Sequence, residues 1–242
     1  MIQQRHMPES KRSIGKNKVG HAVHPKLNRG AILPRPDTLH PGAILWHPEI
    51  LVTSTGSAVP DPTVSLCRHP AHPCPEIEGI EVLIARSDAH GLSLIYQVHG
   101  HINRLALPAR RKPACSEGLW KHTCFEAFIA IEGQRAYQEF NFSPSGEWAH
   151  YAFSAYRRRT GGLRPSPAPD TAIHHSPTCL EFRASLGAEL LPSGHSRVAL
   201  RLGLSAVLET VDGAHSFWAL SHPCPQPDFH RRASFLISLS SL

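Results

Sequence analysis

A histidine, a thiol and a carboxylate stand two residues apart in the stretch GLWKHTCFEAFIAIEG, residues 118–133. His122, Cys124 and Glu126 are side-chain types that can bind a metal ion or carry out nucleophilic catalysis. The stretch is typical of a β-strand, in which alternate residues lie about 6.6–6.8 Å apart, so His122 and Glu126 would be about 13 Å apart. They cannot share one metal ion. Nothing in the sequence places a base beside Cys124, which we interpret as a small, partly buried thiol.

A second group of possible metal ligands lies in the segment CRHPAHPC, which contains Cys67, His69, His72 and Cys74. A related segment, HPCP, recurs at residues 222–225. Zinc accepts cysteine and histidine, but structural zinc sites usually pair two ligand clusters across a fold. The prolines between these residues limit how far the chain can curl around one ion. We therefore expect no bound metal.

Sequence motifs of common enzyme classes are missing from the chain. It contains no Gly-rich phosphate loop, no nucleophile elbow and no His-Glu-x-x-His helix. The sequence therefore predicts a protein that is not an enzyme, with no catalytic residues and no cofactor.

The elements that would position these side chains are short β-strands. From about residue 77 onward, runs rich in Val, Ile, Leu, Phe and Tyr end at Gly, Pro, Asn or Ser. This pattern predicts one all-β domain of two packed antiparallel sheets, a β-sandwich. The Pro-rich segment 157–171 is predicted to be a surface loop whose first three arginines, residues 157–159, are solvated. The expected strands cover residues 77–85, 92–100, 103–108, 122–131, 136–142, 147–156, 178–186, 197–209, 216–220 and 233–239.

The first 62 residues differ from the rest, because they hold eight Lys and Arg against four Asp and Glu and only short apolar runs. A basic segment can attract nucleic acid or anionic lipid, but this composition buries too little apolar surface to offset chain entropy. We expect a disordered extension over 1–62, with no site in it. Neither a signal peptide nor a membrane span is predicted, which favours a cytoplasmic protein with mostly reduced cysteines and without a membrane or nucleic-acid partner.

Two turns predict the register of three consecutive strands. Glycine at position 133 suits the first central position of a two-residue II′ turn, which would pair Glu126 with Asn141. The segment SPSG, residues 143–146, suits a type I turn, which would pair Asn141 with Trp148. The same register pairs Glu139 with His150.

Because side chains alternate along a strand, this register sorts the three strands into two faces. The expected core face carries Phe125, Ala127, Ile129, Ile131, Phe140, Phe142, Ala149, Tyr151 and Phe153. The other face mixes polar groups with rings and carries His122, Cys124, Glu126, Phe128, Tyr137, Glu139, Asn141, Trp148, His150 and Tyr156.

Aromatic rings beside hydrogen-bonding groups are what a neutral, hydroxyl-rich ligand needs, because rings stack on it and polar groups orient it. On the polar face, Trp148 with Glu126, Asn141, Glu139 and His150 supplies this combination. We therefore predict a small-ligand-binding protein whose ligand is a carbohydrate or polyol. The alternative is a solvated outer face, with Trp148 and Phe128 covered by a loop, in a structural or partner-binding sandwich with no small ligand.

Four stretches carry a family resemblance: LWKHTCFEAFI (119–129), YQEFNFSPSGEWAHYAF (137–153), LRLGLSAVLE (200–209) and FWALSHPCPQPDFH (217–230). In these the chain resembles the bacterial DOMON-like domain proteins, which are related to DOMON domains and to the family 9 carbohydrate-binding modules. With HPAHPCPEIEGIEV upstream, the similarity covers about residues 66–240, and we place the domain at 66–242. The resemblance implies a jelly-roll-like β-sandwich without catalytic activity, in a superfamily whose members bind sugars or haem.

The resemblance also bears on the ligand. Haem-binding DOMON relatives use methionine and histidine as axial ligands, whereas the methionines here are Met1 and Met7, outside the domain. Haem is therefore the alternative ligand, and it would need two histidines. In the carbohydrate modules paired tryptophans clamp the sugar, and the pair here would be Trp148 with Trp120 or Trp218. The expected ligand-binding residues are thus Trp148, Glu126, Asn141, Glu139, His150, Trp120 and Trp218.

Overall fold

Antiparallel strands dominate the part of the protein that the computed structural model describes, residues 62–86, 90–164 and 167–240. The expected extension over 1–62 lies outside these residues except for its last one. The strands are β1 (Thr63–Arg68), β2 (Ile77–Arg86), β3 (Leu92–Gly100), β4 (Cys124–Ile131), β5 (Tyr137–Phe142), β6 (Trp148–Ala155), β7 (Arg158–Arg159), β8 (Asp170–His175), β9 (Cys179–Leu186), β10 (Leu200–Glu209), β11 (His215–Ala219) and β12 (Ile237–Leu239). Short 3-10 helices are η1 (Ile102–Arg104), η2 (Leu119–Lys121), η3 (Ala188–Leu190) and η4 (Arg232–Ser234). The predicted all-β class is confirmed.

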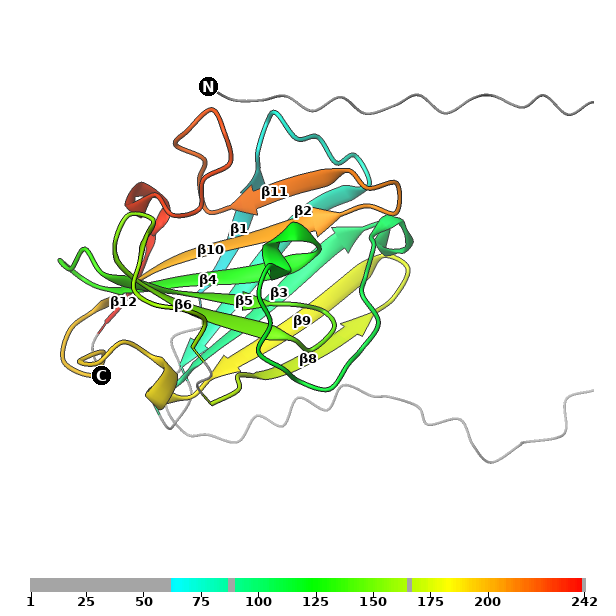
Figure 1. Ribbon diagram of the computed structural model, residues 1–242. Helices are drawn as coiled ribbons and strands as arrows, with labels where there is room; N and C mark the ends of the chain where they lie inside the picture. Colours follow the sequence, from blue (N-terminus) through cyan, green and yellow to red (C-terminus); the bar gives the residue numbers. More distant parts are fainter. Residues whose placement is uncertain (1–61, 87–89, 165–166, 241–242) are drawn as a thin grey trace, which may run out of the picture. The chain divides into compact units, whose positions relative to one another are not determined.

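The strands form two layers joined through β1. The first sheet has the order β1-β2-β3-β9-β8 and the second the order β11-β10-β4-β5-β6-β7, with β12 also paired to β10. β1 pairs with β2 through Thr63–Leu66 and then with β11 through Cys67 and Arg68, so it passes from one sheet to the other. Figure 1 shows β4, β5, β6 and β10 as one layer and β2, β3, β8 and β9 as another. The predicted antiparallel β-sandwich is confirmed.

The main hydrophobic core lies between the two sheets. Phe125 of β4 stacks on Phe182 of β9 with ring centroids 4.7 Å apart, and Tyr96 of β3 lies 5.0 Å from Phe125. The Tyr96 hydroxyl donates a 2.8 Å hydrogen bond to the backbone carbonyl of Glu126, which satisfies its polar atom inside the core. Burial of each such ring contributes about 1.5–3 kcal/mol to stability.

The outer face of the second sheet is also covered, because all eight residues of β4 are buried. A covering segment, residues 227–235, lies on this face, and its Phe235 packs with Phe128 and Tyr137 at ring distances of 5.7 Å. Gly203 permits this approach, since a Cβ there would lie 2.7 Å from the Phe235 ring. A second apolar cluster therefore stands where a simple sandwich would expose a polar face.

The predicted register of β4 and β5 is confirmed, since Glu126 pairs with Asn141 and Phe128 with Glu139. The turn type is different. The backbone N–H of Gln134 donates to the Ile131 carbonyl, which makes Gly133, with φ of 77°, the second central residue of the turn instead of the first.

The predicted register of β5 and β6 is wrong by one residue, because Phe142 pairs with Trp148 and Asn141 with Ala149. The turn bond from Gly146 N–H to the Ser143 carbonyl forms, but Ser143 then pairs with Glu147. Gly146 has φ of 93°, so the connection is a three-residue loop with a glycine bulge. The extra residue moves Ala149, Tyr151 and Phe153 to the outer face. It moves Trp148 and His150 to the core face.

Several predicted elements differ in extent. Residues 103–108 form no strand: η1 takes up Ile102–Arg104, and Leu105 makes only an isolated bridge to Thr210. The predicted loop 157–171 contains the whole of β7 and the start of β8, and β1 begins at Thr63, upstream of the region of resemblance. No helix in the described ranges is long and apolar enough to cross a membrane.

Candidate ligand-binding site

The outer face of the second sheet contains a cavity of about 380 Å³. This volume lies in the range of small-molecule sites, about 300–1,000 Å³. Its floor comes from β4, β5, β6 and β10, and its walls come from η2, β7, β11 and the covering segment. The lining residues are Trp120, Glu126, Phe128, Glu139, Tyr151, Phe153, Arg157, Arg159, Val207, Phe217, Pro227, Phe229 and His230.

Two glutamates lie side by side on the cavity floor. Glu126 pairs with Asn141 and Phe128 with Glu139, so the two carboxyl groups are diagonal neighbours on one face of the β4–β5 pair. Glu126 is 3% exposed and Glu139 is 6% exposed. The Ser205 hydroxyl donates to Glu126 Oε2 at 3.1 Å, and the Asn141 amide donates to Glu139 Oε1 at 2.7 Å.

Burial shifts the titration of both carboxyl groups. It raises the pKa of Glu126 to about 8, helped by the charge of Glu139 and opposed by the Ser205 hydrogen bond and the charge of Arg157. Burial likewise raises the pKa of Glu139 to about 7, opposed by the Asn141 hydrogen bond and by the charges of Arg157 and Arg159. The pair therefore shares protons near neutral pH, as closely placed buried acids do.

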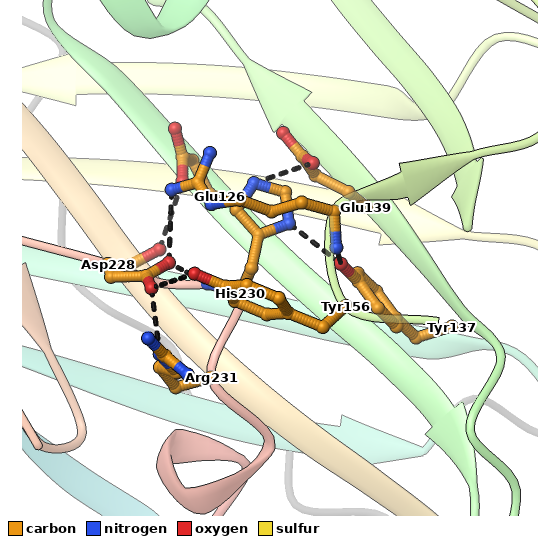
Figure 2. Close-up of polar contacts among 9 residues, drawn as sticks. Glu126, Tyr137, Glu139, Tyr156, Asp228, His230 and Arg231 are labelled. Atoms are coloured by element: carbon orange, nitrogen blue, oxygen red, sulfur yellow. Dashed lines mark hydrogen bonds and ion pairs between the residues drawn. The ribbon is translucent and has the colours of Figure 1, made fainter. Parts of the chain in front are cut away.

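A histidine from the covering segment connects the floor to the wall. Tyr137 lies 2.9 Å from His230 Nδ1, and His230 Nε2 lies 3.7 Å from Glu139 Oε2, as Figure 2 shows. The Tyr137 oxygen also accepts a 3.1 Å hydrogen bond from the Arg157 backbone N–H, so the phenol proton is directed at Nδ1. Burial and the charge of Arg157 lower the pKa of His230 to about 4. His230 is therefore neutral at pH 7, with its Nε2–H on the side of Glu139.

Asp228 holds the edge of the covering segment through three side chains. Its carboxylate accepts hydrogen bonds from the Tyr156 hydroxyl at 2.6 Å, Arg157 Nη2 at 3.0 Å and Arg231 Nε at 3.0 Å. Figure 2 shows the bonds that tie Asp228 to Tyr156 and Arg231. These bonds lower the pKa of Asp228 although burial opposes the shift. The carboxylate is thus ionised and fixes Arg157 at the cavity wall.

Aromatic side chains form the open side of the cavity. Trp120 of η2 is 40% exposed and meets Tyr151 edge to face with ring centroids 6.0 Å apart. The Arg159 guanidinium lies 4.1 Å from the Tyr151 ring centroid and pairs with Glu117 at 2.9 Å. A ring that is accessible beside buried acceptors can stack on a ligand while the acceptors bind its polar groups.

The structure brings together three of the seven predicted site residues at the cavity: Glu126, Glu139 and Trp120. Asn141 is fully buried beside them and supports Glu139. The remaining three lie elsewhere. Trp148 and His150 are on the core face because of the Gly146 bulge, and His150 stacks on Phe140 at 4.2 Å.

Trp218 also lies away from the cavity. It is 3% exposed within the main core, where its Nε1 donates to the Ser216 hydroxyl at 3.0 Å. Its neighbour Phe217 points to the opposite face of β11 and lines the cavity instead. A tryptophan pair of Trp148 with Trp120 or Trp218 is therefore not formed around this cavity.

Sequence reasoning missed most of the walls and the part of the floor that β6 supplies. Arg157 and Arg159 were expected to be solvated in a loop, and Tyr151 and Phe153 were expected in the core. A signal for the covering segment was present in the motif PDFH, residues 227–230, which carries the family resemblance and supplies Phe229 and His230. No local pattern indicated that this motif would lie on β4 and β5.

His122, Cys124 and Glu126, the possible metal-binding or catalytic residues in the stretch 118–133, lie in three different environments. His122 Nδ1 lies 2.8 Å from Glu209 Oε2, and the exposed imidazole precedes the start of β4. Cys124 is fully buried, and burial raises the pKa of its thiol well above the usual range. A protonated thiol is a poor nucleophile, so of the three residues Glu126 alone contributes to the cavity.

The two segments rich in cysteine and histidine meet in the fold. His222 Nε2 lies 2.8 Å from the Cys67 carbonyl, and His69 Nε2 lies 3.4 Å from the Cys224 carbonyl. These contacts join β1 to the chain after β11. Within the described residues no group of three or more His, Cys, Asp or Glu is arranged to hold a metal ion.

Comparison with known proteins gives a fold relationship only. No family model matches the chain, and no curated protein matches it. A structure from Bacteroides uniformis, described as a candidate carbohydrate-binding protein, is similar with a TM-score of 0.56 and 16% identity, over 75% of this chain and 87% of that one. A family 9 carbohydrate-binding module from Caldicellulosiruptor kristjanssonii, in complex with glucose, gives a TM-score of 0.40 and 11% identity, over 68% and 76% of the two chains. The first similarity shows that this chain shares the fold of the Bacteroides uniformis protein.

Proposed function

We propose that this protein binds a carbohydrate or polyol in the cavity on the outer face of its second sheet, and that it is not an enzyme. The observation that carries the proposal is the combination of the exposed Trp120 ring with the buried carboxyl groups of Glu126 and Glu139 in one cavity of about 380 Å³. Such a site can stack on an apolar ring face and accept hydrogen bonds from hydroxyl groups.

Each part of the cavity has a separate task in this proposal. Trp120 supplies the stacking platform at the open side. Glu126 Oε1 and Glu139 Oε2 accept hydrogen bonds from ligand hydroxyls, since their partner oxygens already accept from Ser205 and Asn141. The guanidinium groups of Arg157 and Arg159 act as donors at the rim.

Two comparisons support this function. The Bacteroides uniformis protein, whose fold this chain shares, is described as carbohydrate-binding. The sequence resemblance to the bacterial DOMON-like proteins points the same way, because that superfamily includes sugar-binding members.

The placement of the two glutamates favours binding over hydrolysis. Glycosidases generally use two carboxyl groups that flank the scissile bond. Here Glu126 and Glu139 are neighbours on adjacent strands of one floor, so both approach a ligand from the same side. We therefore expect no hydrolysis of aryl glycosides by the purified protein.

Calorimetric titration with a panel of neutral aldoses and alditols tests the proposal. At least one member should bind, and Trp120→Ala should weaken its binding about tenfold or more by removing the stacking platform. In titrations at pH 9, above the Glu126 pKa of about 8, Glu126→Gln should also weaken binding about tenfold or more, because a charged acceptor contributes about 1.5–3 kcal/mol. Glu132→Gln is the matched control, since Glu132 follows the same strand but faces Arg201 outside the cavity. Absence of binding across the panel, or a Soret band after purification with added haem, would count against the proposal.

A further inference from the structure

When ionised, the two buried glutamates would place more negative charge at the cavity than the surrounding cations compensate. Glu126 Oε1 accepts no hydrogen bond from any described residue, and Glu139 Oε2 has only the 3.7 Å contact with His230. Both residues line the cavity although each is more than nine-tenths buried. Each therefore presents one oxygen to a ligand.

The arginines near the glutamates are already paired with other acids. Arg157 binds Asp228 at 3.0 Å, Arg231 binds the same carboxylate at 3.0 Å, and Arg159 binds Glu117 at 2.9 Å. These three guanidinium groups face four carboxyl groups when Glu126 and Glu139 are included. One negative charge is left when all four acids are ionised.

The other ionisable groups around the pair are neutral at pH 7. Burial lowers the pKa of His230 to about 4 and raises that of Tyr137 and Tyr151 to about 12. Near Glu126, burial also raises the pKa of the Cys124 thiol and the pKa of the Tyr96 phenol well above their usual values. None of these five groups therefore supplies a cation to the pair.

We propose that the ligand of this cavity carries a protonated amine in addition to its hydroxyl groups, as an amino sugar or an amino polyol does. This inference rests on the proposed function, whose ligand class it narrows. An ammonium group between Glu126 and Glu139 would fill the two free acceptor positions with charge-assisted hydrogen bonds. The rings of Trp120 and Phe229 at the same cavity would add cation–π attraction.

A neutral sugar would satisfy the hydrogen bonds but would bring no charge to offset an ionised glutamate pair. The protein alone can reduce that charge by keeping a proton on the glutamate pair, as the raised pKa values of both residues indicate. An ammonium group would take the place of this proton. Binding of an amine should therefore release protons, whereas binding of a neutral sugar should release few.

Matched ligand pairs test the inference: glucosamine with glucose, galactosamine with galactose, and glucamine with sorbitol. Calorimetry at pH 6.5 in phosphate and in a buffer of larger ionisation enthalpy measures both affinity and proton release. The amine of at least one pair should bind about tenfold or more tighter than its partner, with about one proton released per ligand. Glu126→Gln and Glu139→Gln should reduce the preference severalfold, and Glu132→Gln should leave it unchanged.

The same titrations distinguish failure of the amine inference from failure of the proposed function. If neutral members bind as tightly as the amines, or if the enthalpies agree in both buffers, the amine inference is wrong and the proposed function stands. If no member of any pair binds, both are wrong. If the preference for the amine persists in both glutamine variants, the ammonium group lies elsewhere and the inference is overturned.

Discussion

The Tyr137 phenol and the His230 imidazole, 93 residues apart in sequence, lie 2.9 Å from each other and connect the covering segment to β5. This bond places His230 beside Glu139 and holds Phe229 at the cavity wall. The site is therefore completed by a segment that follows the last long strands of the chain, and its geometry depends on long-range contacts.

Tyr137→Phe should loosen the covering segment without unfolding the sandwich. The variant leaves His230 Nδ1 and the Arg157 backbone N–H without the phenol, at a cost of about 1–3 kcal/mol. Hydrogen exchange should become faster in residues 227–235 and stay unchanged in β2, β3 and β9. Unchanged exchange in 227–235 would show that the bond does not hold the segment.

Trp148→Ala should destabilise the protein by about 3–5 kcal/mol, as expected for a buried tryptophan. Trp148 is 4% exposed on the face of Phe142, whereas Trp120 is 40% exposed. Trp120→Ala should therefore change the free energy of unfolding by less than about 1 kcal/mol. Urea unfolding of both variants measures the difference, and equal losses would contradict the one-residue shift of β6.

Gly146→Ala should destabilise the β5–β6 connection by about 1–2 kcal/mol, because alanine is strained at a φ of 93°. Gly162→Ala is the control, since a Cβ added at Gly162 would meet no atom within 4 Å and Gly162 is not among the glycines with positive φ. Chemical denaturation should show a loss of stability for Gly146→Ala only. Equal stability of the two variants would argue against the bulge.

Glu126 and Glu139 should make the folded protein less stable as the pH rises from 6.5 to 8.5. Burial raises their pKa values to about 8 and about 7, above the usual value of 4.5. In this window the folded state keeps protons that the unfolded chain has lost, so raising the pH through the folded pKa values removes stability. His150 and His230, whose folded pKa values are lowered to about 4, act with the opposite sign and below about pH 6.5.

Urea unfolding across this pH range measures the effect. The free energy of unfolding should fall by about 1–2 kcal/mol more in the wild type than in Glu126→Gln. In the exposed control Glu132→Gln, the free energy of unfolding should change with pH as it does in the wild type. Parallel curves for wild type and Glu126→Gln would contradict a raised pKa at this position.

The sequence predicted the elements whose pattern is local. Alternation along β4 and β5 placed Glu126, Asn141 and Glu139 on one face, and this placement is confirmed. The β6 register could not be predicted in the same way, because SPSG fits a two-residue loop and a three-residue loop with glycine in the left-handed region. That single extra residue decides whether Trp148 or Tyr151 faces the cavity.

The walls of the cavity could not be predicted from the sequence for a different reason. Arg157 precedes and Arg159 ends the two-residue strand β7, which is too short to leave a periodic signal. His230 reaches the site through contacts with residues about 90 positions earlier, such as the bond to Tyr137, and brings the neighbouring Phe229 with it. Such contacts depend on the assembled sheet and leave no pattern in either segment alone.

The location of the ligand is the central claim, and fluorine NMR of protein labelled with 5-fluorotryptophan tests it directly. Resonances are assigned by single Trp→Phe substitutions, and the protein is titrated with the tightest ligand of the sugar and amine panels. The Trp120 resonance should shift on saturation, while those of Trp148 and Trp218, buried away from the cavity, should stay within the linewidth. A shift of Trp148 or Trp218 with an unchanged Trp120 would contradict the site described above.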